Sequence, residues 1–168
     1  MYNNKYQLYC LKNKMKIKKI TNNYQETKIF AKKIAKNILK NNHQKEKATI
    51  IALEGDLGAG KTTFVQGFAE ELKIKEKILS PTFLIIKKFN IKNEIFRNFF
   101  HIDCYRIKKT DEIISLDFKK IISNPKNIVL IEWANKIKKI LPKGILKIKF
   151  DILNQNKRKI SVEKERDA

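Results

Sequence analysis

The feature that most constrains this chain is a glycine-rich segment between a short apolar run and a helical pattern. Residues 55–62 read Gly-Asp-Leu-Gly-Ala-Gly-Lys-Thr and contain three of the five glycines in the chain. Before them, Ala48–Leu53 is an apolar run typical of a strand buried on both faces. After them, Thr62–Leu72 has helical spacing of its apolar residues. A strand, a glycine loop and a helix in this order predict a cradle for phosphate groups.

The spacing is that of a P-loop, in which a glycine, four residues and Gly-Lys-Ser/Thr follow one another. Backbone N–H groups of such a loop converge on phosphate oxygens, and only glycines permit the backbone conformations and the close approach. The Lys61 ammonium would reach the terminal phosphates, and the Thr62 hydroxyl would bind Mg²⁺. We therefore predict a bound nucleoside triphosphate with Mg²⁺. The predicted phosphate-binding residues are Gly55, Asp56, Leu57, Gly58, Ala59, Gly60, Lys61, Thr62 and Thr63.

The remaining elements follow from apolar spacing. Residues Asn23–Asn42 predict an amphipathic helix capped by Asn23 with Glu26, and Thr110–Ile122 predict a helix capped by Thr110. Short runs rich in Ile or Phe predict strands at Phe83–Phe89, Ile95–Ile102 and Ile128–Ile131, and an antiparallel hairpin formed by Ile145–Leu153 and Lys159–Glu163. Together these elements predict an α/β fold: a P-loop NTPase-like three-layer domain with a mixed central sheet and a C-terminal antiparallel hairpin.

A length of 168 residues suits one domain. Residues 1–14 are polar and aperiodic, and a second Met follows at position 15. We interpret residues 1–14 as a flexible leader or a start placed too far upstream, and residues 15–168 as a single P-loop ATPase domain.

The net charge of +21 raises nucleic acid as a partner. However, only four of the 38 basic residues are arginines, and the lysines are spread along the whole chain. This pattern favours codon supply in a genome rich in A and T over a site that reads nucleic acid, because such sites usually prefer Arg.

The two cysteines, Cys10 and Cys104, are too few and too far apart in the sequence for a disulfide framework or a zinc site. No apolar run approaches the roughly 18 to 20 residues of a membrane span, and the N-terminus lacks the apolar stretch of a signal peptide. These observations predict a cytoplasmic protein without membrane contact.

Two carboxylates follow predicted strands. Asp103 comes after Phe99–Ile102, and Glu132 comes after Ile128–Ile131. Strand ends are where ligands bind in open α/β sheets, so either side chain can hold Mg²⁺, directly or through water, or orient an attacking water. Either one alone could equally be a solvated strand end, but beside a P-loop we expect at least one to act in the site. His101 is open to two interpretations, a strand-end polar residue or a residue that places Asp103.

Four motifs occur in a characteristic order: Gly55–Thr63, then Ser-Pro-Thr-Phe at 80–83, then His-Ile-Asp-Cys-Tyr-Arg at 101–106, then Glu132-Trp133. Together they resemble the bacterial TsaE (YjeE) family, the ATPase of tRNA threonylcarbamoyladenosine synthesis. The resemblance covers roughly Lys16 to Glu163. The first motif is shared by many NTPases, whereas the four together are specific.

The resemblance implies that the chain binds ATP and Mg²⁺, hydrolyses ATP slowly alone, and works with the TsaB and TsaD proteins. These partners transfer a threonylcarbamoyl group to the adenosine beside the anticodon of tRNAs that read codons beginning with A. The chain itself would meet tRNA through the complex. Lys61, Asp103 and Glu132 would be catalytic, with Thr62 and Glu132 as metal ligands and Asp103 supporting hydrolysis. Further residues implied near the nucleotide are Thr27, Thr82, Trp133 and Arg158.

Other functions remain as alternatives. A P-loop small-molecule kinase shares the strand, loop and helix, but such enzymes commonly use several arginines, which are scarce here. A GTPase would need an Asn-Lys-x-Asp stretch, and residues 135–138 read Asn-Lys-Ile-Lys, so adenine is preferred. A nucleic-acid-binding module would be revealed by sequence-selective tRNA binding.

Overall fold

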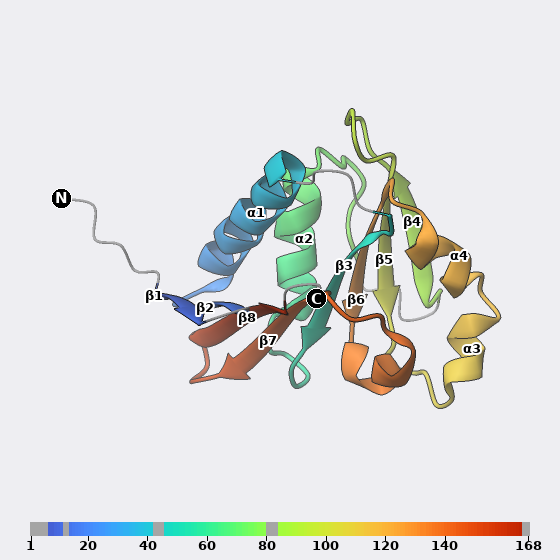
Figure 1. Ribbon diagram of the computed structural model, residues 1–168. Coiled ribbons are helices and arrows are strands. Elements are labelled where there is room, and N and C mark those ends of the chain that lie inside the picture. The colour runs from blue at the N-terminus through green and yellow to red at the C-terminus, as the bar shows by residue number, and fades with distance from the viewer. Residues whose placement is uncertain (1–6, 12–13, 42–45, 80–83, 166–168) are drawn as a thin grey trace.

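The computed structural model describes all residues except 1–6, 12–13, 42–45, 80–83 and 166–168 (Figure 1). Within the described residues, the strands form one eight-stranded sheet in the order β1-β2-β8-β7-β3-β6-β5-β4. The strands are β1 (Gln7–Leu11), β2 (Lys14–Thr21), β3 (Thr49–Glu54), β4 (Ile86–Asn90), β5 (Asn98–Asp103), β6 (Asn127–Glu132), β7 (Leu146–Ile152) and β8 (Arg158–Glu165). The helices are α1 (Tyr24–Asn41), α2 (Lys61–Glu71), α3 (Thr110–Ile114), α4 (Phe118–Ser123) and the 3₁₀ helix η1 (Ala134–Ile140).

The centre of the sheet is parallel and its margins are antiparallel. Strand β3 pairs in parallel with both β6 and β7, and β6 pairs in parallel with β5. Strands β4, β8, β2 and β1 each run antiparallel to a neighbour. All of β6 and nearly all of β3 are buried, as expected for parallel strands covered on both faces. The predicted mixed sheet and C-terminal hairpin are therefore confirmed.

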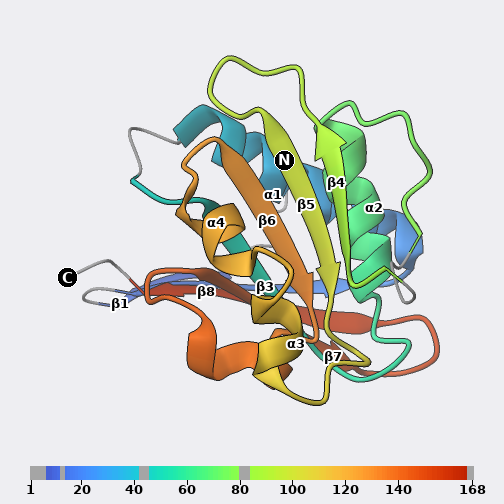
Figure 2. The same ribbon diagram turned by 90° about the vertical axis from the view of Figure 1, so that its right-hand side faces the viewer.

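Helices cover both faces of the sheet (Figures 1 and 2). Along β3, Ile51 and Leu53 pack into the hydrophobic cluster under α1 and α2. The alternate residues Ile50 and Ala52 pack into a second cluster with α3, α4 and η1. This period of two places residues of the central strands β3, β5 and β6 in both cores, so the three-layer prediction is confirmed. Among the residues that the structure describes, no helix combines the length and apolar character needed to cross a bilayer.

The single helix predicted over Thr110–Ile122 is wrong. The structure breaks it into α3 and α4, because Asp117 takes a left-handed conformation with φ of 57°. The predicted cap is also wrong, since Lys109 is the N-cap residue of α3. The Glu112 carboxylate accepts hydrogen bonds from the backbone N–H groups of Lys108 and Lys109 and so closes this helix start.

Several strand boundaries also differ from those predicted. Strand β4 begins only at Ile86, and Phe83 lies outside the described residues. Strand β5 begins at Asn98 rather than Ile95, because the Asn93 side chain accepts from the N–H groups of residues 95 and 96 and forms a turn there. Part of the predicted leader is ordered, since residues 7–11 form β1 against β2. The remaining division of the chain at residue 15 stays a prediction.

Candidate functional site

The glycine loop, residues 55–60, joins the buried strand β3 to helix α2. Gly55 has φ of +149°, and a Cβ there would lie 2.7 Å from the Phe150 carbonyl oxygen, so a side chain is excluded. Gly58 and Gly60 have φ of +75° and +97°, in the left-handed region that favours glycine. Gly60 is the N-cap of α2 and offers no capping side chain. The loop therefore presents an uncapped helix start, which suits an anion.

Lys61 is folded back onto this loop and is only 4% exposed. Its ammonium donates hydrogen bonds to the Gly55 carbonyl at 2.7 Å and to the Asp56 carbonyl at 2.8 Å. The same Nζ lies 3.9 Å from the centre of the Trp133 ring, a cation–π contact. Carbonyl dipoles and an aromatic face thus surround the charge.

Burial is the largest influence on the Lys61 ammonium and lowers its pKa below the ordinary value. The carboxylates of Glu132, Asp103 and Asp56 act in the opposite direction, in that order of strength. The three carboxylates stabilise the positive charge of Lys61 at this buried position.

Glu132 ends β6 and meets the first turn of α2. The Thr62 hydroxyl donates to Glu132 Oε2 at 2.9 Å and lies 3.1 Å from Oε1. Glu132 is 2% exposed. The structure therefore brings together the two residues predicted as metal ligands, which lie 70 positions apart in the sequence.

Asp103 ends β5, and its Cα is paired with that of Glu132 across the parallel ladder. It is buried, and one of its carboxylate oxygens accepts the backbone N–H of Tyr105 at 2.8 Å. The ends of β3, β5 and β6 meet at one edge of the sheet, with Leu53 paired to Glu132. The sequence-based expectation that both carboxylates stand at strand ends is confirmed.

The sequence leaves His101 open between a strand-end polar residue and a residue that places Asp103. The Nε2 of His101 lies 2.8 Å from Glu132 Oε1, so its hydrogen bond is with Glu132, a partner that neither interpretation names. The available signal was its position two residues before Asp103, which puts both side chains on one face of β5. Which residue His101 contacts depends on the register of β5 against β6, which the sequence pattern does not reveal.

Three further residues that the sequence implies as nucleotide contacts differ in their relation to the glycine loop. The Thr27 hydroxyl bonds to Thr21 Oγ1 at 3.0 Å, which joins α1 to β2, and donates to the Asn23 carbonyl at 3.3 Å just before α1. Neither bond reaches the glycine loop. Arg158 does reach it, donating to the Gly58 carbonyl at 3.1 Å. Thr82 lies outside the described residues. The nucleotide roles of all three stay predictions.

Trp133 has φ of 58° and directly follows Glu132, so its ring turns toward Lys61 and packs against Tyr105 with ring centres 5.1 Å apart. Of the other loop residues, Leu57 is exposed and Ala59 is buried. Thr63 lies half-buried in the first turn of α2.

The donors at Thr62 and Glu132 fit Mg²⁺, which prefers hydroxyl, carboxylate, water and phosphate oxygens. In the described part of the chain, no group of three or more His, Cys, Asp and Glu side chains is arranged to hold a metal on its own. This donor set suits an ion that takes most of its remaining ligands from phosphate and water.

Comparison with known proteins agrees with this geometry. A profile of the family described as "Threonylcarbamoyl adenosine biosynthesis protein TsaE" matches residues 21–160. A relative of that name from Rickettsia typhi is 38% identical over 145 residues, covering 86% of this chain and 92% of the relative. The Bacillus subtilis relative is 37% identical over 141 residues, covering 84% and 81%. The crystal structure of Bacillus subtilis YdiB superposes with a TM-score of 0.66 at 32% identity, covering 90% of this chain and 86% of that one. The chain therefore belongs to the TsaE family of tRNA threonylcarbamoyladenosine biosynthesis proteins.

Proposed function

We propose that this chain is a P-loop ATPase whose hydrolysis of ATP supports threonylcarbamoyl transfer to tRNA by the TsaB and TsaD proteins. The observation that carries the proposal is the meeting of Lys61, Thr62 and Glu132 beside the glycine loop. Family membership supports the role in tRNA threonylcarbamoyladenosine synthesis, and the arrangement of these residues supports ATP hydrolysis.

The glycine loop and Lys61 bind the phosphates of ATP. In the free protein the ammonium uses the carbonyls of Gly55 and Asp56 as partners. On binding, it exchanges these neutral acceptors for phosphate oxygens, which carry negative charge and form stronger hydrogen bonds. The uncapped start of α2 adds backbone N–H donors.

Thr62 and Glu132 hold the Mg²⁺ that accompanies ATP. The Thr62 hydroxyl proton is directed to the Glu132 carboxylate, which leaves the lone pairs of its oxygen for the metal. Bound Mg²⁺ would neutralise charge that develops on the β- and γ-phosphates.

Asp103 supports the attack of water on the γ-phosphate. Its carboxylate stands beside Glu132 on the adjacent strand and can accept a proton of the attacking water, which orients the water oxygen. We assign the metal to Glu132 rather than Asp103 because Thr62 contacts Glu132. Hydrolysis then drives a conformational or release step in the assembly, while the partners carry out the chemistry on tRNA.

Fluorescence of Trp133, the only Trp in the chain, tests the site. Its ring lies against Lys61 Nζ, so displacement of the ammonium by phosphate should change the emission. We expect saturable changes with ATP and ADP and none with GTP at the same concentration. Calorimetry that finds no binding of ATP or ADP to the folded protein would contradict the proposal.

The coupling to partners is tested by phosphate release with and without TsaB and TsaD. We expect slow turnover by the chain alone and faster turnover with both partners present. An unchanged rate would contradict the coupling while leaving the nucleotide site intact.

A further inference from the structure

A buried imidazole stands behind the Thr62–Glu132 pair. His101 lies in β5, is 0% exposed, and is paired across the ladder with Leu130, two residues before Glu132 in β6. This register brings its Nε2 to 2.8 Å from Glu132 Oε1. The imidazole and the Thr62 hydroxyl therefore contact the same carboxylate.

The hydrogen-bond chemistry fixes which nitrogen carries the proton. Both oxygens of Glu132 lie within hydrogen-bond distance of the Thr62 hydroxyl, and an ionised carboxylate can only accept. His101 Nε2 must therefore donate the hydrogen bond to this carboxylate. Within the described residues, Nδ1 is buried and has no hydrogen-bond partner.

An unpartnered buried nitrogen costs stability. An apolar side chain would pack here without that cost, as Phe99 does on the same face of β5. The imidazole makes its hydrogen bond with Glu132, so its benefit must lie in what it does to that carboxylate.

We infer that His101 is a positioning residue that holds the Glu132 carboxylate against the Thr62 hydroxyl, so that the two metal ligands are in place before Mg²⁺ arrives. The inference rests on the proposed function, because it concerns the same metal site. A partner that orients a metal ligand lowers the cost of binding the metal and leaves metal-free nucleotide binding unchanged.

Two variants separate this role from a packing role. His101→Phe keeps a planar ring and removes the donor, whereas His101→Gln keeps an amide N–H donor of similar reach. We expect His101→Phe to raise the Mg²⁺ concentration that half-saturates ATP hydrolysis roughly 10- to 100-fold. We expect His101→Gln to stay within a few-fold of the parent protein, and both variants to bind ADP in EDTA with the parent affinity, followed by Trp133 fluorescence. Equal Mg²⁺ requirements in the two variants would overturn the inference.

A measurement on the parent protein covers the case in which a variant fails to fold. The chain has only two histidines, His43 and His101, so ¹⁵N-labelled histidine gives few signals, and the His43→Gln spectrum assigns them. We expect a proton on His101 Nε2 in the free protein, with the Nε2 signal shifting in Glu132→Gln. A ring protonated at Nδ1 alone would overturn the inference. Failure of the parent protein to bind ADP would instead contradict the proposed function, so the two failures are distinct.

Discussion

At the scale of single residues, the site is built from charges that have partners before any ligand binds. Lys61 is almost fully buried, and an isolated ammonium there would be costly. Two loop carbonyls and the Trp133 ring offset that cost without cancelling the charge. The free protein therefore keeps the positive charge of Lys61 in place. A charged acceptor such as phosphate would form stronger hydrogen bonds with it than the two carbonyls do.

This arrangement separates the effects of two substitutions. Lys61→Ala should weaken nucleotide binding by a factor on the order of 100, because hydrogen bonds to charged groups are worth about 1.5–3 kcal/mol. Glu132→Ala should retain part of the binding and lose turnover, because the proposed phosphate-binding loop remains while the proposed metal ligand is removed. Calorimetry with ATP and a phosphate-release assay measure the two quantities. Equal loss of binding in both variants would mean that Glu132 has been wrongly assigned.

Cys104 offers a residue-scale test of the core beside the site. Burial is the main cause that raises the pKa of this thiol to about 12, and the negative charge of Asp103 adds to it. Since the thiolate is the reactive form, native protein carrying Cys10→Ser should react with a thiol reagent at pH 8 far more slowly than the same protein in denaturant. Absorbance of the released chromophore follows the reaction. A fast reaction in the native state would show that the thiol is accessible.

The same pKa shift links stability to pH. The native-state pKa of Cys104 lies above the ordinary value of 9.0. The contribution of the neutral thiol to the free energy of unfolding is therefore complete below about pH 9. It is lost as pH rises toward 12, since the unfolded chain releases this proton first.

At the scale of elements, α2 is fixed by its contact with α1, which lies alongside it (Figure 1). Gly67 of α2 is the point of closest approach among the described glycines: a Cβ there would lie 2.5 Å from the Lys28 carbonyl oxygen and 2.6 Å from its Cα. Both neighbours are backbone atoms and cannot rotate away. The start of α2 carries Lys61 and Thr62, so this contact fixes the helix that carries them.

Gly67→Ala should therefore destabilise the protein, although the same change in an unobstructed helix would stabilise it by about 1 kcal/mol. We expect a net loss of about 1–3 kcal/mol from the forced separation of the helices, measured by urea unfolding. Glu71→Ala in the same helix is the matched control and should stay within about 0.5 kcal/mol of the parent. A stabilised Gly67→Ala variant would show that α1 moves without cost.

The elements nearest the glycine loop were predictable from the sequence because their signals are local. The apolar run of β3 and the glycines after it each have one reasonable interpretation, and the carboxylates at strand ends followed from them. The break at Asp117 was hidden because apolar spacing continues from α3 into α4. The partner of His101 could not be predicted either, since it depends on the register of β5 against β6. Local patterns thus predicted residues that the structure brings together, such as Lys61, Thr62 and Glu132, and long-range pairing decided how they touch.

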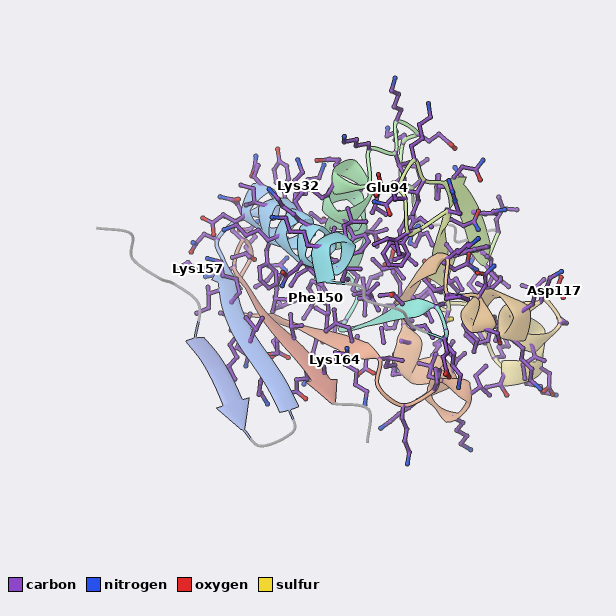
Figure 3. All side chains as sticks on the ribbon, turned by 45° about the horizontal axis from the view of Figure 1, so that its top comes forward. Lys32, Glu94, Asp117, Phe150, Lys157 and Lys164 are labelled. Carbon is purple, nitrogen blue, oxygen red and sulfur yellow. The ribbon has the colours of Figure 1, made fainter. Side chains whose placement is uncertain are left out.

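At the scale of the whole molecule, the net charge of +21 is dispersed over the fold. Figure 3 labels Lys32 on α1, Lys157 in the turn before β8 and Lys164 on β8, three separate parts of the surface. A dispersed charge attracts phosphate backbones but carries no means of reading bases, since selective readout uses side chains aimed at base edges. Under the proposed function, selection of the tRNA would then come from the TsaB and TsaD proteins.

The isolated chain should therefore bind tRNA without selectivity and with steep dependence on salt. If about four phosphates are contacted, affinity should fall on the order of 100-fold between 50 and 200 mM salt. Fluorescence anisotropy with a tRNA that reads codons beginning with A, and with one that does not, should give equal affinities at each salt concentration. A preference for the first tRNA that persists at 200 mM salt would contradict this expectation, because counterion release acts equally on both. Such a preference would mean that part of the lysine surface forms a true recognition site, and that tRNA selection begins in this chain and not in the proposed partners.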